Sequence, residues 1–171
     1  TYINANHHMV ATIGVDNLII VDTPDVTYIA TQDKAQEVKS IVEYLQSEGR
    51  CEGSTHRKVY RPWGWYDSIE SSKYFQVKRL HINPKAKLSL QMHYKRAEHW
   101  VVVSGIATVI NGDEVLTLNK GESTYISLGI THSLENKTNE PLEVIEVQSG
   151  IYLGEDDIVR LDDKYGRIKY E

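Results

Sequence analysis

The chain has 171 residues and a formal net charge of -5, from 19 basic and 24 acidic side chains. This length accommodates one well-buried domain and a smaller appendage, but not two complete enzymes, because domains usually run to roughly 100–200 residues. The basic residues are scattered along the chain and do not cluster. The composition therefore gives no electrostatic reason to expect nucleic acid as a partner.

The sequence has the features of a protein of a reducing compartment. Its single cysteine, Cys51, cannot form an internal disulfide, and we interpret it as a bystander and not as a nucleophile. The longest apolar stretch, Leu18–Val21, is far shorter than the roughly 20 residues that a membrane helix needs. The N-terminus also lacks the pattern of a signal peptide. We therefore expect a cytoplasmic protein with no membrane partner.

Residues 1–48 are predicted to form short strands and one helix. Strands are expected at Met9–Ile13, Leu18–Asp22 and Val26–Thr31, because turn-forming Gly, Asn, Pro and Asp residues separate these runs. An amphipathic helix is expected over 33–48, because apolar residues recur there at helical spacing: Ala35, Val38, Ile41, Val42 and Leu45. The apolar stripe of this helix requires a partner surface.

Residues 49–58 are polar and contain glycine, which predicts a linker and a domain boundary. In residues 59–171 the character changes to short β-rich runs separated by turn residues, which favours a sandwich or barrel of antiparallel strands. The acidic run 155–157 and the tail are expected on the surface. The main expected strands are Phe75–Ile82, Leu88–Met92, His99–Val103, Ala107–Ile110, Ser123–Ser127 and Leu142–Val147.

Four residues between positions 91 and 132 have the types and the spacing of a metal site. Gln91 and His93 are two residues apart, so they project from the same face of a strand, and Glu98 can return to that face after a short turn. His132 begins another strand behind the turn-forming residues 128–131. A lone histidine in a β protein is more often a solvated or hydrogen-bonded side chain, but the joint spacing favours ligands. Oxygen donors with two imidazoles suit a divalent transition metal and exclude a thiolate site.

These residues resemble the two sequence motifs of cupins, G(x)5HxH(x)4E(x)6G and G(x)5PxG(x)2H(x)3N. The first motif is matched by Gln91, His93, Glu98 and Gly105, and the second by Gly121, Gly129, His132 and Asn136. Lys85 and Ser127 stand where the motifs have Gly and Pro, which affects turns and not ligands. The resemblance implies a mainly β fold, the double-stranded β-helix or jelly-roll barrel. The Gln-x-His variant is similar to the metal set of phosphomannose isomerases.

The resemblance extends over most of residues 60–167. Segments such as 61–66, 75–79, 152–160 and 165–167 are similar to the C-terminal domain of the bifunctional mannose-1-phosphate guanylyltransferase/mannose-6-phosphate isomerase family. Segments 14–23 and 36–39 resemble the end of that family's guanylyltransferase domain, which agrees with a chain that starts with Thr1 and not Met. We therefore expect a piece of a longer polypeptide. The family's nucleotide-binding loop is absent from this sequence, so this chain alone should not make GDP-mannose.

The resemblance implies a type II mannose-6-phosphate isomerase of GDP-mannose and polysaccharide biosynthesis. It would use one divalent metal ion, with zinc as first choice and iron, manganese, nickel or cobalt as alternatives. Lys78 and His99 are our candidates for the general base. Lys78 alternates with Leu80 and Ile82, so it either points into the barrel, where burial would lower its pKa, or extends to the rim. His99 follows Glu98 directly, which favours a structural role on the other face.

A phosphate group requires cations, and arginine offers a planar fork suited to it. The resemblance to the family's C-terminal signature makes Arg160 and Arg167 the first choice, with Arg61 and Arg96 second; an ordinary surface arginine would only form salt bridges. Three tryptophans can stack on a sugar face, but core or interface roles are more usual. These are Trp63, Trp65 and Trp100.

Two alternatives remain open at the level of sequence. The cupin can be a non-catalytic module that binds a sugar or nucleotide sugar and stabilises or regulates the guanylyltransferase, although the complete ligand set argues against this. It can also be a different cupin enzyme, such as an oxygenase or a sugar epimerase, but Gln91 departs from the histidine-rich iron site of oxygenases. A homodimer is compatible with this fold.

Overall fold

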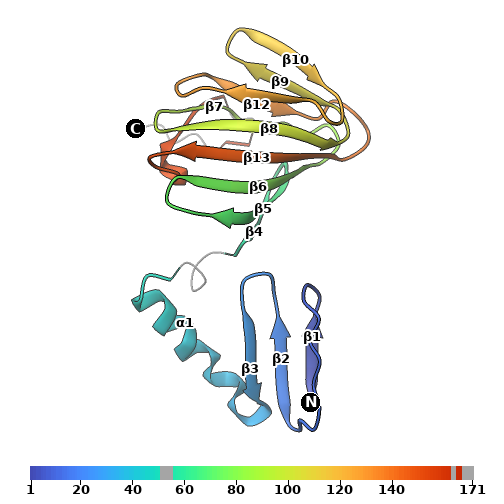
Figure 1. Cartoon of the computed structure of the whole chain (residues 1–171), viewed down its shortest axis with the longest axis vertical. Coiled ribbons are helices and arrows are strands. Elements are labelled where there is room, and N and C mark those ends of the chain that lie inside the picture. Colours follow the sequence, from blue (N-terminus) through green and yellow to red (C-terminus); the bar gives the residue numbers. More distant parts are fainter. Residues whose placement is uncertain (51–55, 163–164, 167–171) are drawn as a thin grey trace. The chain divides into compact units, whose positions relative to one another are not determined.

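The computed structural model describes residues 1–50, 56–162, 165 and 166. The chain forms two compact units, Thr1–Arg57 and Lys58–Glu171, each with its own sheets (Figure 1). The division falls at the end of the segment 49–58 in which we expect a linker. Cys51 lies outside the described residues.

The first unit is a three-stranded sheet followed by a helix (Figure 1). Strand β1 (Tyr2–Ala5) pairs in parallel with β2 (Leu18–Asp22), and β2 pairs antiparallel with β3 (Thr27–Thr31). A short 3-10 segment, η1 (Gln32–Glu37), leads into α1 (Val38–Ser47). The strand at Leu18–Asp22 therefore has the bounds expected from the sequence.

Two expectations for this unit are wrong in detail. The segment Met9–Ile13 forms no strand, and the first strand lies earlier, at β1. Met9 and Ile13 are 94% and 97% exposed, so their side chains do not pack against an apolar surface. Without such packing, their alternation does not stabilise a strand. The helix starts at Val38, later than expected, and none of its residues is buried. Val38, Ile41 and Val42 of its apolar stripe are exposed, and Leu45 is half-buried.

The second unit consists of two antiparallel sheets (Figure 1). The five-stranded sheet has the order β10-β9-β12-β7-β14, and the six-stranded sheet has the order β11-β8-β13-β6-β5-β4. In chain order the strands are β4 (Lys58–Arg61), β5 (Gly64–Ser71), β6 (Phe75–Ile82), β7 (Leu90–His93), β8 (Arg96–Ser104), β9 (Ala107–Asn111), β10 (Glu114–Leu118), β11 (Ser123–Ile126), β12 (His132–Glu135), β13 (Leu142–Gly150) and β14 (Ile158–Asp162), with a short 3-10 turn η3 (Glu155–Asp157) before β14.

The hydrophobic core of this unit is built from alternate residues of its strands. In β13, every second residue from Leu142 to Gln148 is buried, and the residues between them are partly exposed. The core brings together side chains from both sheets, including Trp100, Leu134 and Leu142. Each fully buried aliphatic side chain of this kind contributes about 1.5–3 kcal/mol. The expected fold, a mainly β cupin-like double-stranded β-helix, is confirmed.

The expected strand Phe75–Ile82 matches β6, and the other strands expected here are observed with shifted ends. Strands β4, β5, β10 and β14 were missed, because polar residues such as Asp67 and Glu70 interrupt the apolar alternation. The acidic run 155–157 is not wholly on the surface. Asp157 is buried, and its carboxylate accepts a hydrogen bond from the Lys95 backbone N–H at 3.0 Å.

The turns of the cupin motifs show why glycine is usual in them. Gly105, Gly121 and Gly129 have φ angles of 85°, 87° and 73°, in the left-handed region that glycine tolerates best. Lys85 stands at the remaining motif glycine and adopts the same conformation, with φ of 60°. Its ammonium group donates a hydrogen bond of 2.7 Å to the Lys137 carbonyl oxygen. The substitution therefore preserves the turn at the cost of backbone strain.

Replacement of Lys85 by Gly is expected to stabilise the chain. Relief of the left-handed strain should raise the free energy of unfolding by about 0.5–1 kcal/mol, net of the exposed hydrogen bond that is lost. Urea unfolding followed by circular dichroism measures the change. The matched control is Lys87→Gly, which removes a lysine two residues away and should destabilise the chain. A Lys85→Gly chain that unfolds at lower urea than wild type would contradict the interpretation.

Candidate metal centre

Three of the four expected ligands come from strand ends in the second unit. His93 is the last residue of β7, Glu98 lies in β8 after a two-residue turn, and His132 is the first residue of β12. All three are buried, with exposed fractions of 2%, 1% and 1%. The histidines belong to the five-stranded sheet and the glutamate to the six-stranded sheet. The cluster therefore spans the interior between the two sheets.

The three side chains converge on one point. The Oε1 atom of Glu98 lies 3.0 Å from His93 Nε2, and its Oε2 atom lies 3.6 Å from His132 Nε2. One ligand atom from each residue lies within 4.8 Å of the others, and the two imidazole rings are 5.0 Å apart. A single ion fits among donors spaced in this way, since each metal–ligand bond is about 2.0–2.2 Å long.

Backbone carbonyl groups orient both imidazoles. His132 Nδ1 lies 2.9 Å from the Ile130 carbonyl oxygen, and His93 Nδ1 lies 3.4 Å from that of Asp157. A carbonyl oxygen only accepts, so each contact places a proton on Nδ1 and turns Nε2 toward Glu98. Within the described part of the chain, the buried Nε2 of His132 has no hydrogen-bond partner. A metal ion would satisfy this atom, so the cluster is consistent with a cupin metal site.

The surroundings keep the ligands in their binding forms. Burial opposes ionisation of Glu98, but the close polar contact with His93 and the positive charges around the carboxylate, including Arg96, outweigh burial and lower the carboxyl pKa. Burial lowers the pKa of His132, against the opposing attraction of Glu98, so its imidazole is neutral at neutral pH. Ionised carboxylate and neutral imidazole are the forms that bind metals.

A second buried carboxyl group, Glu146, lies beside Glu98 and was missed from the sequence. The Trp100 indole N–H lies 3.1 Å from both Glu98 Oε2 and Glu146 Oε1. The Gln148 amide lies 3.1 Å from Glu98 Oε1 and 2.9 Å from Glu146 Oε2. Burial, together with the charge of Glu98, raises the pKa of Glu146 to about 8. The only sequence signal was the alternation in β13 that points Glu146 and Gln148 inward.

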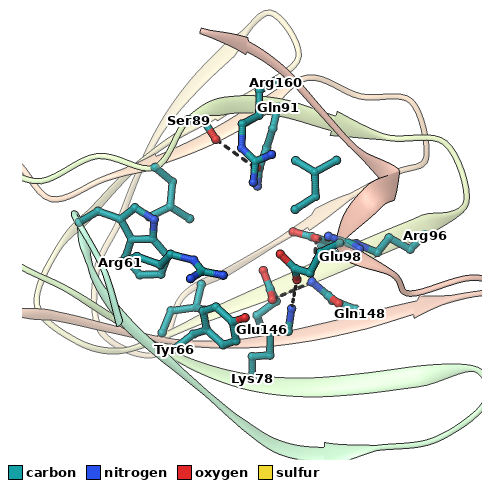
Figure 2. Close-up of a pocket in the computed structure, with 15 residues that line it drawn as sticks. Arg61, Tyr66, Lys78, Ser89, Gln91, Arg96, Glu98, Glu146, Gln148 and Arg160 are labelled. Atoms are coloured by element: carbon teal, nitrogen blue, oxygen red, sulfur yellow. Dashed lines mark hydrogen bonds and ion pairs between the residues drawn. The ribbon is translucent and has the colours of Figure 1, made fainter. Parts of the chain in front are cut away.

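A pocket lies beside the cluster and contains the fourth expected ligand (Figure 2). Gln91 lines this pocket, two residues before His93 in β7, and it is paired with His132 in register. Its carbonyl oxygen accepts a hydrogen bond of 3.1 Å from the Ser89 hydroxyl. The strand alternation therefore places Gln91 as expected, and its role as a ligand stays a prediction.

The two candidates for the general base lie in different places. Lys78 is buried in the pocket wall, and its ammonium donates a hydrogen bond of 2.8 Å to Glu155. Burial alone would lower the pKa of Lys78, but the negative charges of Glu146 and Glu155 outweigh it and raise the pKa. The expectation of a lowered pKa is therefore wrong. His99 is exposed on the other face of β8, 6.3 Å from the ring of Tyr125, because successive strand residues face opposite sides.

The arginines expected to bind phosphate divide into two groups. Arg61 and Arg160 line the pocket, and Figure 2 shows their guanidinium groups directed into it. Arg96 also borders the pocket, but it is buried and donates to the Gly154 carbonyl oxygen at 3.0 Å and to Glu98 at 3.3 Å, which indicates a structural role. Arg167 lies outside the described residues.

The tryptophans are used mainly for packing. Trp63 and Trp100 are buried in the core, although Trp63 also borders the pocket. The ring of Trp65 stacks on His81, with ring centroids 4.9 Å apart, and the Lys58 ammonium lies 3.8 Å from the ring centroid. With these two groups against it, Trp65 does not offer an open face to a sugar.

The double-stranded β-helix identifies the second unit as a cupin, and its buried His, Glu, His cluster has the residue types of a cupin metal site. The family model described as "Mannose-6-phosphate isomerase C-terminal" matches residues 48–163, so the chain belongs to this family. A second model, described as "MannoseP isomerase/GMP-like beta-helix domain", matches residues 1–45. These matches confirm the resemblance to the C-terminal part of the bifunctional family.

The chain is similar to three biosynthetic proteins over nearly its whole length. It is 57% identical over 159 residues to the xanthan biosynthesis protein XanB of Xanthomonas campestris, covering 93% of this chain and 34% of XanB. It is 51% identical over 168 residues to the mannose-1-phosphate guanylyltransferase ManC of Salmonella typhimurium, covering 98% of this chain and 35% of ManC. For the alginate biosynthesis protein AlgA of Pseudomonas aeruginosa the identity is 50% over 165 residues, covering 96% and 34%. The chain thus spans about a third of these relatives.

Solved structures support the fold alone. Oxalate decarboxylase from Bacillus subtilis gives a TM-score of 0.56 at 22% identity, over 63% of this chain and 30% of that one. A Klebsiella pneumoniae protein with a double-stranded β-helix domain gives a TM-score of 0.51 at 20% identity, and the match covers 65% of this chain and 89% of that one. Among the described residues, no helix is long and apolar enough to cross a membrane.

Removal of either imidazole is expected to weaken metal binding. His93→Ala and His132→Ala should each reduce the affinity for Zn²⁺ or Mn²⁺ by at least about 100-fold, because each removes one donor from the buried cluster. Competition with a chromogenic chelator measures the affinity. His99→Ala is the matched control and should bind the metal as the wild type does. Equal affinity in all four chains would show that the cluster is not the metal site.

Proposed function

We propose that the chain is a metal-dependent isomerase that interconverts mannose 6-phosphate and fructose 6-phosphate. One observation carries this proposal: a pocket joins a buried His, Glu, His cluster to inward-directed cations, within the region matched by the mannose-6-phosphate isomerase family. In this reaction a proton moves between C2 and C1 of the sugar, and negative charge develops on the oxygens of both carbons. The site must therefore stabilise that charge, bind the phosphate and move the proton.

Negative charge on the sugar oxygens is assigned to the metal end of the pocket. His93, Glu98 and His132, with Gln91 as the fourth ligand, would hold one divalent ion, with zinc as first choice and iron, manganese, nickel or cobalt as alternatives. Such an ion, when bound, supplies Lewis-acid stabilisation of the developing charge. The buried surroundings strengthen this effect, because electrostatic interactions are weakly screened where water is excluded.

The phosphate group is assigned to the arginine end of the pocket. Arg61 enters from β4 and Arg160 from β14, so strands of both sheets supply a guanidinium group (Figure 2). Guanidinium groups bind phosphate oxygens in pairs of parallel hydrogen bonds. A sugar phosphate held in this way would direct its C1 and C2 atoms away from the arginines, toward the cluster. We assign Arg96 to positioning Glu98, to which it donates a hydrogen bond, and not to the phosphate. Arg167 stays a candidate for phosphate binding from the sequence.

Proton transfer is assigned to Glu146 in place of Lys78 and His99. Lys78 is bound to Glu155 in an ion pair, and His99 faces away from the pocket. Glu146 lines the pocket directly beside the ligand Glu98, with which it shares the Trp100 and Gln148 donors. A carboxyl group in this position would lie near a sugar bound at the cluster, as general acid–base catalysis requires.

The longer polypeptide forms part of the same proposal. The relatives are about three times as long as this chain, and one is named a mannose-1-phosphate guanylyltransferase. We infer that this chain is joined covalently to a guanylyltransferase domain that makes GDP-mannose from mannose 1-phosphate. The isomerase site itself is assigned wholly to residues of the second unit.

The purified chain is expected to convert mannose 6-phosphate to fructose 6-phosphate when loaded with a divalent metal. Chelation, His93→Ala and His132→Ala should each reduce the rate by at least about 100-fold, since each removes the charge stabilisation. A coupled assay for fructose 6-phosphate measures the rate, with His99→Ala as the matched control. A metal-loaded chain without turnover would overturn isomerase activity for this chain and favour a non-catalytic, sugar-binding module.

Glu146→Gln is expected to lower kcat by roughly 100-fold or more, because general acid–base catalysis contributes about 10²–10⁴-fold. Metal affinity should change little, since Glu146 is not among the proposed ligands. Glu143→Gln is the matched control on the same strand, because Glu143 faces outward and pairs with Arg79 at 2.7 Å. If Glu146→Gln keeps wild-type turnover, another group moves the proton.

A further inference from the structure

The pocket contains an ion pair that the proposed function leaves unexplained. Lys78 Nζ lies 2.8 Å from Glu155 Oε1. The two side chains differ in exposure: that of Lys78 is 6% exposed and that of Glu155 is 50% exposed. A buried ammonium group without a counter-ion is strongly disfavoured. Glu155 therefore supplies a charge that Lys78 requires, from the solvent side of the pocket.

Lys78 lies close to one of the arginines assigned to phosphate. The Lys78 ammonium is 4.9 Å from the centroid of the Tyr66 ring, and the Arg61 guanidinium carbon is 5.4 Å from the same centroid. The two cations thus flank one ring on the pocket wall, which Figure 2 also shows. An anion placed between these two cations would be attracted to both. In the described structure, the carboxylate of Glu155 occupies the Lys78 side of that position.

The backbone that carries Glu155 is anchored on both sides. Before it, Arg96 donates hydrogen bonds to the carbonyl oxygens of Leu153 at 3.3 Å and Gly154 at 3.0 Å. After it, the Asp157 carboxylate accepts a bond from the Lys95 N–H at 3.0 Å. Release of Lys78 therefore requires only rotation of the Glu155 side chain, whose half-exposed carboxylate can be solvated by water when it leaves.

We propose that Glu155 is an internal substitute for the anionic group of the ligand and is displaced from Lys78 when that group binds. This inference rests on the proposed function for the identity of the ligand, a sugar phosphate. A phosphate has up to two negative charges and three strong acceptor oxygens, so it outcompetes a single carboxylate for Lys78 and Arg61. A sugar without phosphate has no charge to offer and leaves the pair closed. Glu155 thereby determines specificity for phosphorylated sugars.

Binding of inorganic phosphate tests the exchange without turnover. Isothermal titration of phosphate is performed on the full chain, both metal-loaded and after chelation, so that phosphate held by the metal is recognised. Glu155→Gln should tighten binding by about tenfold, and Lys78→Met should weaken it by about tenfold, the scale of coupling between close charges. Asp156→Asn is the matched control, because this neighbouring carboxylate contacts the Tyr152 hydroxyl at 2.6 Å and does not line the pocket. It should leave phosphate binding unchanged.

The double variant gives the decisive comparison. If Glu155 acts through Lys78, Glu155→Gln should have no effect in a Lys78→Met chain, and Lys78→Gln replaces Lys78→Met if the latter does not fold. An equal gain in both backgrounds, weaker binding by Glu155→Gln, or no phosphate binding by any chain would overturn the proposal. The titration is independent of catalysis. A chain with the expected binding pattern but no isomerase activity would support the exchange and overturn the enzymatic assignment alone.

Discussion

The second unit depends on one buried carboxylate, Glu98. A charge in the interior of a protein is tolerated only when other groups pair with it and hydrogen-bond to it, and Glu98 is 1% exposed. Trp100 and Gln148 donate to it from the side of the six-stranded sheet, and His93 approaches from the five-stranded sheet. The sheets therefore meet at a polar centre inside an apolar core. Glu146 shares the Trp100 and Gln148 donors with Glu98, and Arg96, which contacts Glu98, also anchors the turn before β14 through the Gly154 carbonyl oxygen.

The grouping of the candidate ligands could be predicted, because three of the four lie close together in the sequence. Gln91 and His93 lie on β7 and Glu98 on the next strand, β8, which belongs to the other sheet, and the two-residue period of each strand directs these side chains into the interior between the sheets. The same rule placed His99 outside. His132 is distant in sequence, and its place at the start of a strand together with its match to the second cupin motif indicated its role. The overall fold was predictable for the same reason, since those motifs also mark the turns.

The remaining parts of the site depend on contacts between distant segments, which local patterns do not encode. Glu146 and Gln148 reach Glu98 across 48 and 50 residues, positions that follow only from the pairing of β13 with β8. Burial in the barrel was expected to lower the pKa of Lys78, but the negative charges of Glu146 and Glu155, both distant in sequence, reverse the direction of the shift. In the first unit, the segment Met9–Ile13 has strand-like residues, but its exposed Met9 and Ile13 side chains do not pack against an apolar surface. Composition indicates which segments can form strands, and tertiary pairing decides which ones do.

All described residues of the site lie between Arg61 and Arg160, and therefore within one compact unit. Ligands, cations and the anchored turn are inherited together when a gene segment encoding this unit is fused, split or transferred. Selection can then change what stands beside the unit without disturbing its interior chemistry. The cupin is therefore self-contained: its own two sheets hold the whole described site, and a neighbouring domain can change without altering it.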